Sequence, residues 1–205
     1  MMDALKPFDQ VLVGDERWRY FGRTLKRHYE AVSEITLSES VPEEVREQFE
    51  LARNIWLYAF FAYRLLQAAI LVAHTAVEVA LKARASREGL NKKLDLHGLL
   101  EKAIERRWIA DHGFSATKDQ AHQWEEHREI LKLMGARDCG PFVQSADDQA
   151  YARQLVQTIR SIRNGVAHGD ALFVHDISPV FRTIAEFVNQ LFPDDRTQTG
   201  DEPAT

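Results

Sequence analysis

Apolar residues recur at intervals of three and four along most of the chain, which is the period of one face of an α-helix. No run of alternating apolar and polar residues is long enough to indicate a strand. Only 10 of the 205 residues are glycine and 6 are proline, and neither type occurs between Pro42 and Gly89. The pattern therefore predicts an all-α protein, with helices over residues 18–35, 41–85, 96–108, 118–133, 151–166 and 178–191.

Side chains that can cap free amide groups stand at the predicted helix starts. They are Asp15, Ser40, Ser145 and Ser178. Ser40 and Ser145 each precede an acidic residue by three positions, which is the spacing of a capping box. Ser178 is followed by a proline, as is common at the first position of a helix.

The predicted helix over residues 41–85 would be about 65 Å long if unbroken, so we expect a kink or break near Arg53–Asn54. Residues 55–73 are apolar enough to resemble a membrane span. Arg64 and Gln67 near the middle would make insertion costly, so we expect a buried core helix and no membrane partner.

The polar residues of this helix fall within about 80° of one another on a helical wheel. They are Arg64, Gln67, His74, Glu78 and Lys82. One interpretation is that this stripe is the solvent face of the helix. The other is that it lines a cleft, where His74 or Glu78 orients a functional group.

The most informative segment covers residues 160–169, at the end of a helix with an apolar stripe at three- and four-residue spacing. Here the sequence resembles the HEPN superfamily, whose signature R-N-x-x-x-H corresponds to Arg163, Asn164 and His168. Residues 73–83 resemble the E-x-x-L-K segment of that family, and residues 95–100 resemble the H-x-L start of its next helix. The resemblance covers roughly residues 50–191.

The resemblance implies an antiparallel helical bundle of the HEPN type over residues 50–192. Residues 1–49 would be an N-terminal helical extension, and residues 193–205 an acidic mobile tail. The family includes metal-independent endoribonucleases that act as homodimers without a cofactor. The resemblance thus implies RNA cleavage by a toxin or defence effector.

One subgroup of the family is regulated through a tyrosine two positions after the motif histidine. This chain has Asp170 at that position, so we do not expect this regulation. An antitoxin or another regulatory partner protein could neutralise the chain in a different way.

The motif side chains suit an attack of the ribose 2′-hydroxyl on the neighbouring phosphate. His168 is the candidate general base or acid, because imidazole titrates near neutral pH. Arg163 is the candidate phosphate clamp, and Asn164 could position either group by hydrogen bonding. A structural alternative is that His168 interacts with the last carbonyls of the helix while Arg160 and Arg163 form a solvated face.

Geometry constrains this proposed site. Arg163 and His168 would lie roughly 140° apart on a regular helix, so they do not readily converge on one phosphate. Either the helix unwinds after Gly165, or two chains contribute to a shared groove. The resemblance favours the homodimer, with the two motifs facing each other across a two-fold axis.

The formal net charge is −5, so any RNA-binding site must be a local patch. Eight basic residues against four acidic ones make Lys82–Arg107 the best candidate, although such a run is often ordinary solvated surface. The RNA-binding candidates are Lys82, Arg84, Arg87, Lys92 and Lys93, together with Arg160 of the motif segment.

Other chemistry is poorly supported. His122 and His127 are five residues apart rather than four, so with nearby His112 they do not predict a metal site. Cys139 is the single cysteine and has no evident activating base, which fits a reducing cytoplasm. Two rival functions remain open: a catalytically silent HEPN module that binds RNA, nucleotide or a partner protein, and a helical assembly protein.

Overall fold

The computed structural model describes residues 4–90, 94–118, 147–167 and 176–193, with residues 160–167 as backbone alone. No strand occurs in these ranges, which confirms the all-α prediction. The helical elements are η1 (Phe8–Gln10), α1 (Arg17–Tyr20), α2 (Leu25–Ser33), α3 (Glu43–Tyr58), α4 (Leu65–Arg87), α5 (Leu96–Glu105), η2 (Asp111–Gly113), α7 (Ala150–Ala167) and α8 (Ser178–Leu191).

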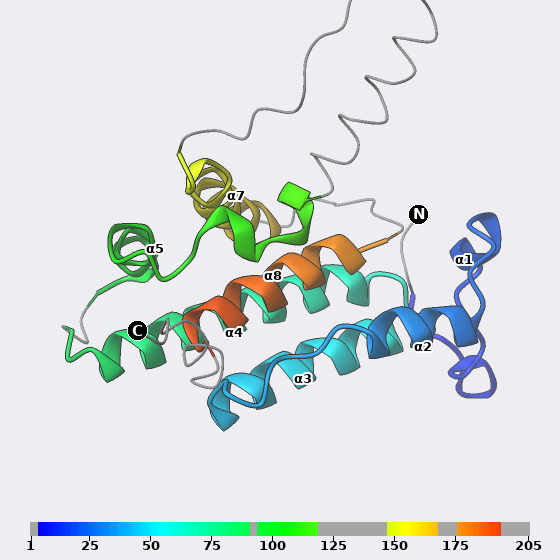
Figure 1. Cartoon of the computed structure of the whole chain (residues 1–205). Helices are drawn as coiled ribbons and strands as arrows, with labels where there is room; N and C mark the ends of the chain where they lie inside the picture. Colours follow the sequence, from blue (N-terminus) through cyan, green and yellow to red (C-terminus); the bar gives the residue numbers. More distant parts are fainter. Residues whose placement is uncertain (1–3, 91–93, 119–146, 168–175, 194–205) are drawn as a thin grey trace, which may run out of the picture.

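Helix α4 is the centre of the fold. It runs antiparallel to α3 at its side and also contacts α5, α7 and α8 (Figure 1). Its buried positions are mostly small or aliphatic, with alanine at 69, 73, 76, 80 and 85, so neighbouring helices can approach closely. By length and composition alone α4 could cross a membrane, and half of its most apolar window is buried inside the protein.

The long helical stretch breaks later than we predicted. The expected break near Arg53–Asn54 is wrong, because α3 continues to Tyr58 and α4 begins only at Leu65. The domain division expected between residues 49 and 50 falls inside α3. Residues of the N-terminal extension, including Trp18 and Val32, belong to the same buried core as Phe49.

Two N-terminal side chains form hydrogen bonds with carbonyl groups at the end of α3. The indole Nε1 of Trp18 donates to the carbonyl oxygen of Ala59 at 3.1 Å. The Nε2 of His28 lies 2.8 Å from the carbonyl oxygen of Trp56. These carbonyls lie at a helix end, where they have few partners within the helix itself, so the N-terminal segment stabilises the break.

Asp15 holds the other side of the break. Its carboxylate accepts from the backbone amide of Tyr63 at 3.2 Å, and its own amide donates to the carbonyl of Phe60 at 2.9 Å. Burial alone would raise the pKa of Asp15, but hydrogen bonds from Arg17 and Tyr63 lower that pKa to about 2. The carboxylate therefore stays ionised at physiological pH and keeps these contacts.

The single helix predicted over residues 18–35 is two helices. Helix α1 ends at Tyr20, and Gly22 follows with a φ of 60°, a left-handed conformation that glycine adopts without strain. Thr24 then starts α2, because its side chain accepts from the amide of Arg27.

Some predicted caps have other roles. Ser40 does not cap α3, because its hydroxyl donates to the carbonyl of Phe192 at 2.6 Å after the end of α8. The bounds predicted for the last helix are confirmed, but its capping side chain is Asp176, which accepts from both the amide and the hydroxyl of Ser178. Ser145 and the helix predicted over 118–133, apart from Lys118, lie outside the described residues.

Candidate functional site

Helix α7 carries the first two motif residues near its end. Its backbone is helical from Ala150 to Ala167, so Arg163 and Asn164 stand in its last two turns. Their side chains, and the whole of His168, lie outside what the structure describes. Earlier in the helix, Ala152, Val156 and Ile159 are buried, which confirms that this helix packs one apolar face into the core.

A buried carboxylate from another element holds the start of α7. The Asp111 side chain, in η2, accepts from the amides of Tyr151 at 3.1 Å and Ala152 at 3.0 Å. The amide of Asp111 in turn donates to the carbonyl of Asp148 at 2.8 Å. A negative charge at a helix N-terminus satisfies free amides and interacts favourably with the helix dipole. Sequence analysis missed this cap, because about forty residues separate its two partners.

Gln149 fixes the same helix start to the end of α5. Its buried amide nitrogen donates to the carbonyl of Ile104 at 3.0 Å and to that of Ile109 at 2.9 Å. Together with Asp111, this side chain ties α7 to the rest of the fold at its N-terminal end. The start of α7 is therefore fixed by these two side chains, while Val156 and Ile159 pack the following turns into the core.

The backbone at the motif bears on the expected unwinding after Gly165 as far as Ala167. The helix does not unwind directly after Gly165, because Val166 and Ala167 are still helical. Residues five apart on such a helix point roughly 140° away from each other. His168 lies outside the described residues, so the structure shows the helical backbone of Arg163 but not the relation between the two groups.

The polar stripe of α4 is not a uniform solvent face. Arg64 and Lys82 are exposed, but His74 is only 4% exposed and Glu78 is half-buried. The Nδ1 of His74 lies 2.8 Å from the carbonyl of Ile70, and Glu78 accepts from the amino group of Lys82 at 2.8 Å. The solvent-face interpretation is therefore wrong for His74, and Glu78 orients Lys82.

Two of the RNA-binding candidates contact the end of α8. The guanidinium of Arg84 donates to the carbonyl of Leu191 at 3.2 Å and pairs with Glu88 at 3.0 Å. The guanidinium of Arg87 lies over the ring of Phe192, 4.7 Å from its centroid. Positive charge is favoured at a helix C-terminus, so these arginines stabilise the contact between α4 and α8.

Glu88, directly after the end of α4, contacts two further side chains. The indole nitrogen of Trp108 donates to its carboxylate at 2.8 Å, and Arg106 lies 4.0 Å from it.

Of the other RNA-binding candidates, Lys82 is exposed, with 56% of its side chain accessible. Lys92 and Lys93, and the side chain of Arg160, lie outside the described residues. Much of the basic character predicted for this segment is thus balanced within the fold.

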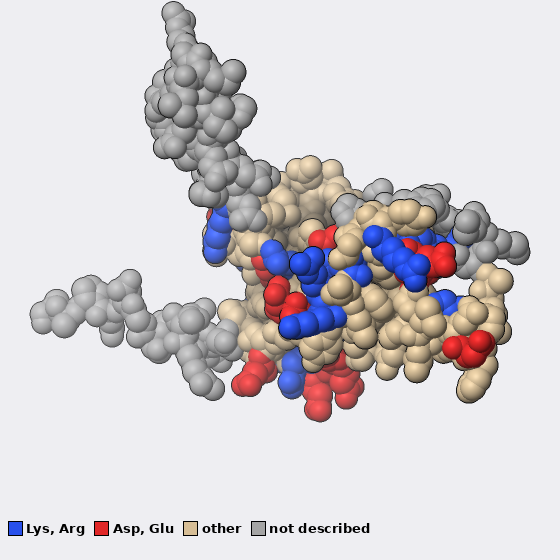
Figure 2. Space-filling model, turned by 90° about the vertical axis from the view of Figure 1, so that its right-hand side faces the viewer, with Lys and Arg blue, Asp and Glu red and all other residues tan. Residues whose placement is uncertain are grey.

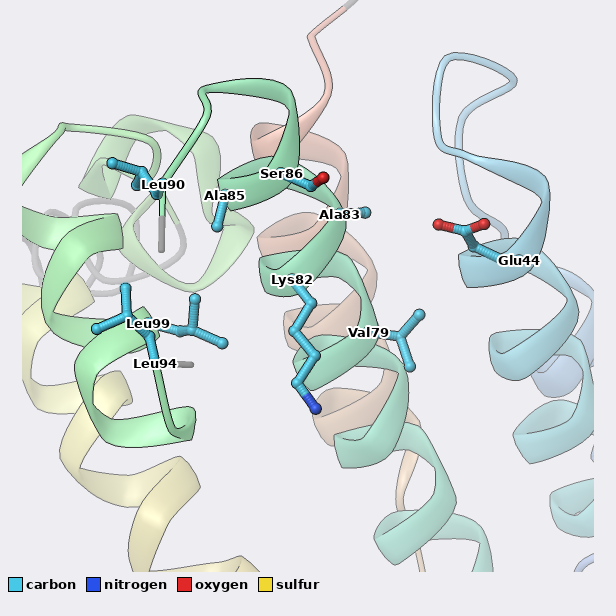
Figure 3. A pocket seen from close by; sticks show the side chains of 9 residues that line it. All are labelled: Glu44, Val79, Lys82, Ala83, Ala85, Ser86, Leu90, Leu94 and Leu99. Carbon is cyan, nitrogen blue, oxygen red and sulfur yellow. The ribbon is translucent and has the colours of Figure 1, made fainter. Parts of the chain in front are cut away.

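A cavity of about 350 Å³ lies between the end of α4 and the start of α5 (Figure 3). Its wall is mainly aliphatic and includes Leu90, Leu94 and Leu99, while Lys82, Ser86 and Glu44 contribute polar groups. Lys82 extends along α4 on the side that faces the leucines, and Glu44 comes from α3 on the other side of α4. The cavity brings Lys82 together with apolar residues, but not with His74, and it forms no acid–base pair.

The described ranges contain no group of three histidine, cysteine, aspartate or glutamate residues that could hold a metal ion. His112 is exposed in η2, whereas His122, His127 and Cys139 lie outside those ranges.

Comparison of the chain with protein-family models, with curated proteins and with solved structures found no match.

Proposed function

We propose that the chain is a metal-independent endoribonuclease of the HEPN type, active as a homodimer in the cytoplasm and controlled by a partner protein, as in a toxin or defence system. The observation that carries the proposal is the position of the motif on α7. Arg163 and Asn164 fall near the end of this helix, which precedes the last helix α8, and His168 follows Ala167 in the sequence. This order is the one that the HEPN resemblance implies.

In the proposed reaction, the ribose 2′-hydroxyl attacks the adjacent phosphorus and the bond to the 5′-oxygen breaks. One proton leaves the 2′-oxygen and one is supplied to the leaving 5′-oxygen. His168 performs a proton transfer, since imidazole exchanges protons near neutral pH. Arg163 stabilises the negative charge of the phosphorane, and Asn164 positions one of these groups. The products are a 2′,3′-cyclic phosphate and a 5′-hydroxyl.

Helix geometry supports a shared site. On a regular helix an Arg163 and a His168 of the same chain would diverge, whereas two α7 helices related by a two-fold axis can direct these groups into one groove. Helix α7 is regular as far as Ala167. In the same proposal, exposed Lys82 contacts the RNA backbone. Arg84 and Arg87 act mainly within the fold.

The test is cleavage of RNA in EDTA by the wild type and by single variants. We expect Arg163→Ala and His168→Ala each to lower the cleavage rate by about 100-fold or more, because each removes one transition-state interaction. Arg153→Ala is the matched control, since Arg153 is an exposed arginine of the same helix that pairs with Asp147. A substrate with 2′-deoxyribose at the cut position should resist the wild type.

Other outcomes separate the rival functions. RNA binding without cleavage would favour a catalytically silent module. Absence of both binding and cleavage would favour an assembly protein. Cleavage that survives both motif variants, or that EDTA abolishes, would contradict the proposal.

A further inference from the structure

Large apolar side chains are exposed on the N-terminal segment, on α1 and α2 and at the end of α3. The N-terminal segment and α1 lie beside the end of α3 at one end of the molecule (Figure 1). We define this N-terminal apolar surface by Leu5, Phe8, Leu12, Tyr20, Tyr29 and Tyr58. Leu5 and Phe8 are 99% and 97% exposed, and Tyr20 is 87% exposed. Isolated exposed apolar residues are ordinary, but such a concentration at one end of a protein is typical of an interaction site.

Two neighbouring grooves in this surface are joined, because they share the residues Tyr58 and Phe61. One groove, of about 840 Å³, lies between the N-terminal segment, including Leu5 and Leu12, and the end of α3. The other, of about 490 Å³, is lined by Tyr29 and its neighbours on α2. A partner that covers Tyr58 and Phe61 therefore contacts both grooves, the larger of which also presents Lys6, Arg17 and Arg64.

The size of the surface indicates a macromolecular partner. From their exposed fractions, the six defining side chains present on the order of 1,000 Å² to solvent, against roughly 800 Å² that each partner contributes to a stable protein interface. A small molecule in either groove would leave Phe8 and Tyr20 uncovered, since neither residue lines a groove.

The composition of this end favours protein over lipid. Aromatic residues and arginine are enriched in protein interfaces, and exposed Arg19 and Arg27 flank the apolar residues here. Acidic residues, including exposed Asp9 and Glu16, accompany them. Figure 2 views the molecule from this side and shows basic and acidic side chains together among uncharged surface. An anionic membrane would instead favour an excess of positive charge.

We infer that the occupant is a second copy of this chain, bound through the N-terminal apolar surface. The surface combines projecting side chains, Leu5, Phe8 and Leu12, with a recess beside Tyr29 and Phe61. A two-fold axis places the projecting segment of each copy in the recess of the other. The same pairing brings Asp9 of the projecting segment near the rim of the recess, where Lys26 carries the opposite charge.

This contact uses a different part of the chain from the α7 pairing proposed above and does not depend on it. A chain with both two-fold contacts forms a tetramer when the two axes intersect at right angles, whereas a chain with the N-terminal contact alone forms a dimer. In either case the loss of the N-terminal contact halves the molar mass.

The experiment is sedimentation equilibrium of the full chain, comparing wild type with the double variant Phe8→Asp, Leu12→Asp. Both side chains are largely exposed, so the variant is expected to fold, and circular dichroism checks this. Leu51→Asp is the matched control, because Leu51 is also an exposed leucine but lines neither groove. We expect the double variant to have half the molar mass of the wild type and the control to keep the wild-type mass.

Two results would overturn the inference. One is an equal mass for the wild type and the folded double variant. The other is a wild type that is already at the lowest mass and that pellets with phosphatidylserine vesicles, which would assign the surface to a membrane.

Discussion

At the scale of single residues, His28 is the clearest case of a titratable group controlled by burial. Its ring is fully buried and lies beside the rings of Trp18 and Phe60. Because a carbonyl only accepts, Nε2 must donate its proton to Trp56, while Nδ1 is buried without a hydrogen-bond partner among the described atoms. Burial lowers the pKa of His28, the Trp56 carbonyl partly opposes this, and the positive charge of Arg23 lowers the pKa further.

This depressed pKa predicts a loss of stability in mild acid. Above the ordinary pKa of 6.5 the imidazole is neutral in both folded and unfolded chains, so its contribution is fully present. Below that pH the unfolded chain binds a proton first, and the free energy of unfolding falls as the pH drops toward the folded-state pKa. We expect urea unfolding to show a larger decrease between pH 7.5 and 5.5 in the wild type than in His28→Gln. An equal decrease in both proteins would show that His28 does not titrate in this way.

The basic residues illustrate what a sequence can and cannot assign at this scale. The cluster of positive charge between Lys82 and Arg107 is evident from the sequence, but the use of each charge depends on distant partners. Arg84 contacts Leu191, more than one hundred residues away, whereas Lys82 pairs with Glu78, four positions earlier on the same helix. The local sequence pattern does not distinguish a basic side chain that contacts a distant helix from one that stays exposed, because Lys82 and Arg84 lie two positions apart on the same helix.

At the scale of elements, sequence periodicity predicted the helices better than their ends. The bounds of α8 agree with the prediction, and α5 begins where expected, with Asp95 accepting from the amide of Gly98. The break between α3 and α4 was misplaced because tertiary contacts stabilise it. Its carbonyls and amides are satisfied by Trp18, His28 and Asp15, which no local helix signal reveals.

The start of α7 provides a prediction at the same scale. We expect Asp111→Ala to lower the free energy of unfolding by about 1–2 kcal/mol, because two amides of the first turn lose a buried acceptor. Asp147→Ala is the comparison, since Asp147 is exposed and accepts from Gln149 just before the helix. Its cost should stay near 0.5 kcal/mol. Equal costs in urea titrations would contradict the role assigned to Asp111.

At the scale of the whole molecule, the sequence predicted the helix that carries the motif and its place before the last helix. It also predicted that Arg163 and His168 would diverge on a regular helix, which stays a prediction because His168 lies outside the described residues. The assembly could not be derived in the same way. Apolar periodicity indicates which side chains are buried, but it does not indicate whether they are buried within the chain or against a second copy. The exposed Phe8 and Leu12 are examples.

The central claim, that two chains share one site, has a direct test in the mixing of two inactive variants. Arg163→Ala and His168→Ala chains are unfolded together, refolded as an equal mixture and assayed for RNA cleavage. If Arg163 of one chain acts with His168 of the other, mixed dimers contain one intact pair, and the mixture should recover about a quarter of wild-type activity. A mixture that forms mixed dimers but stays as inactive as its components would contradict the shared site.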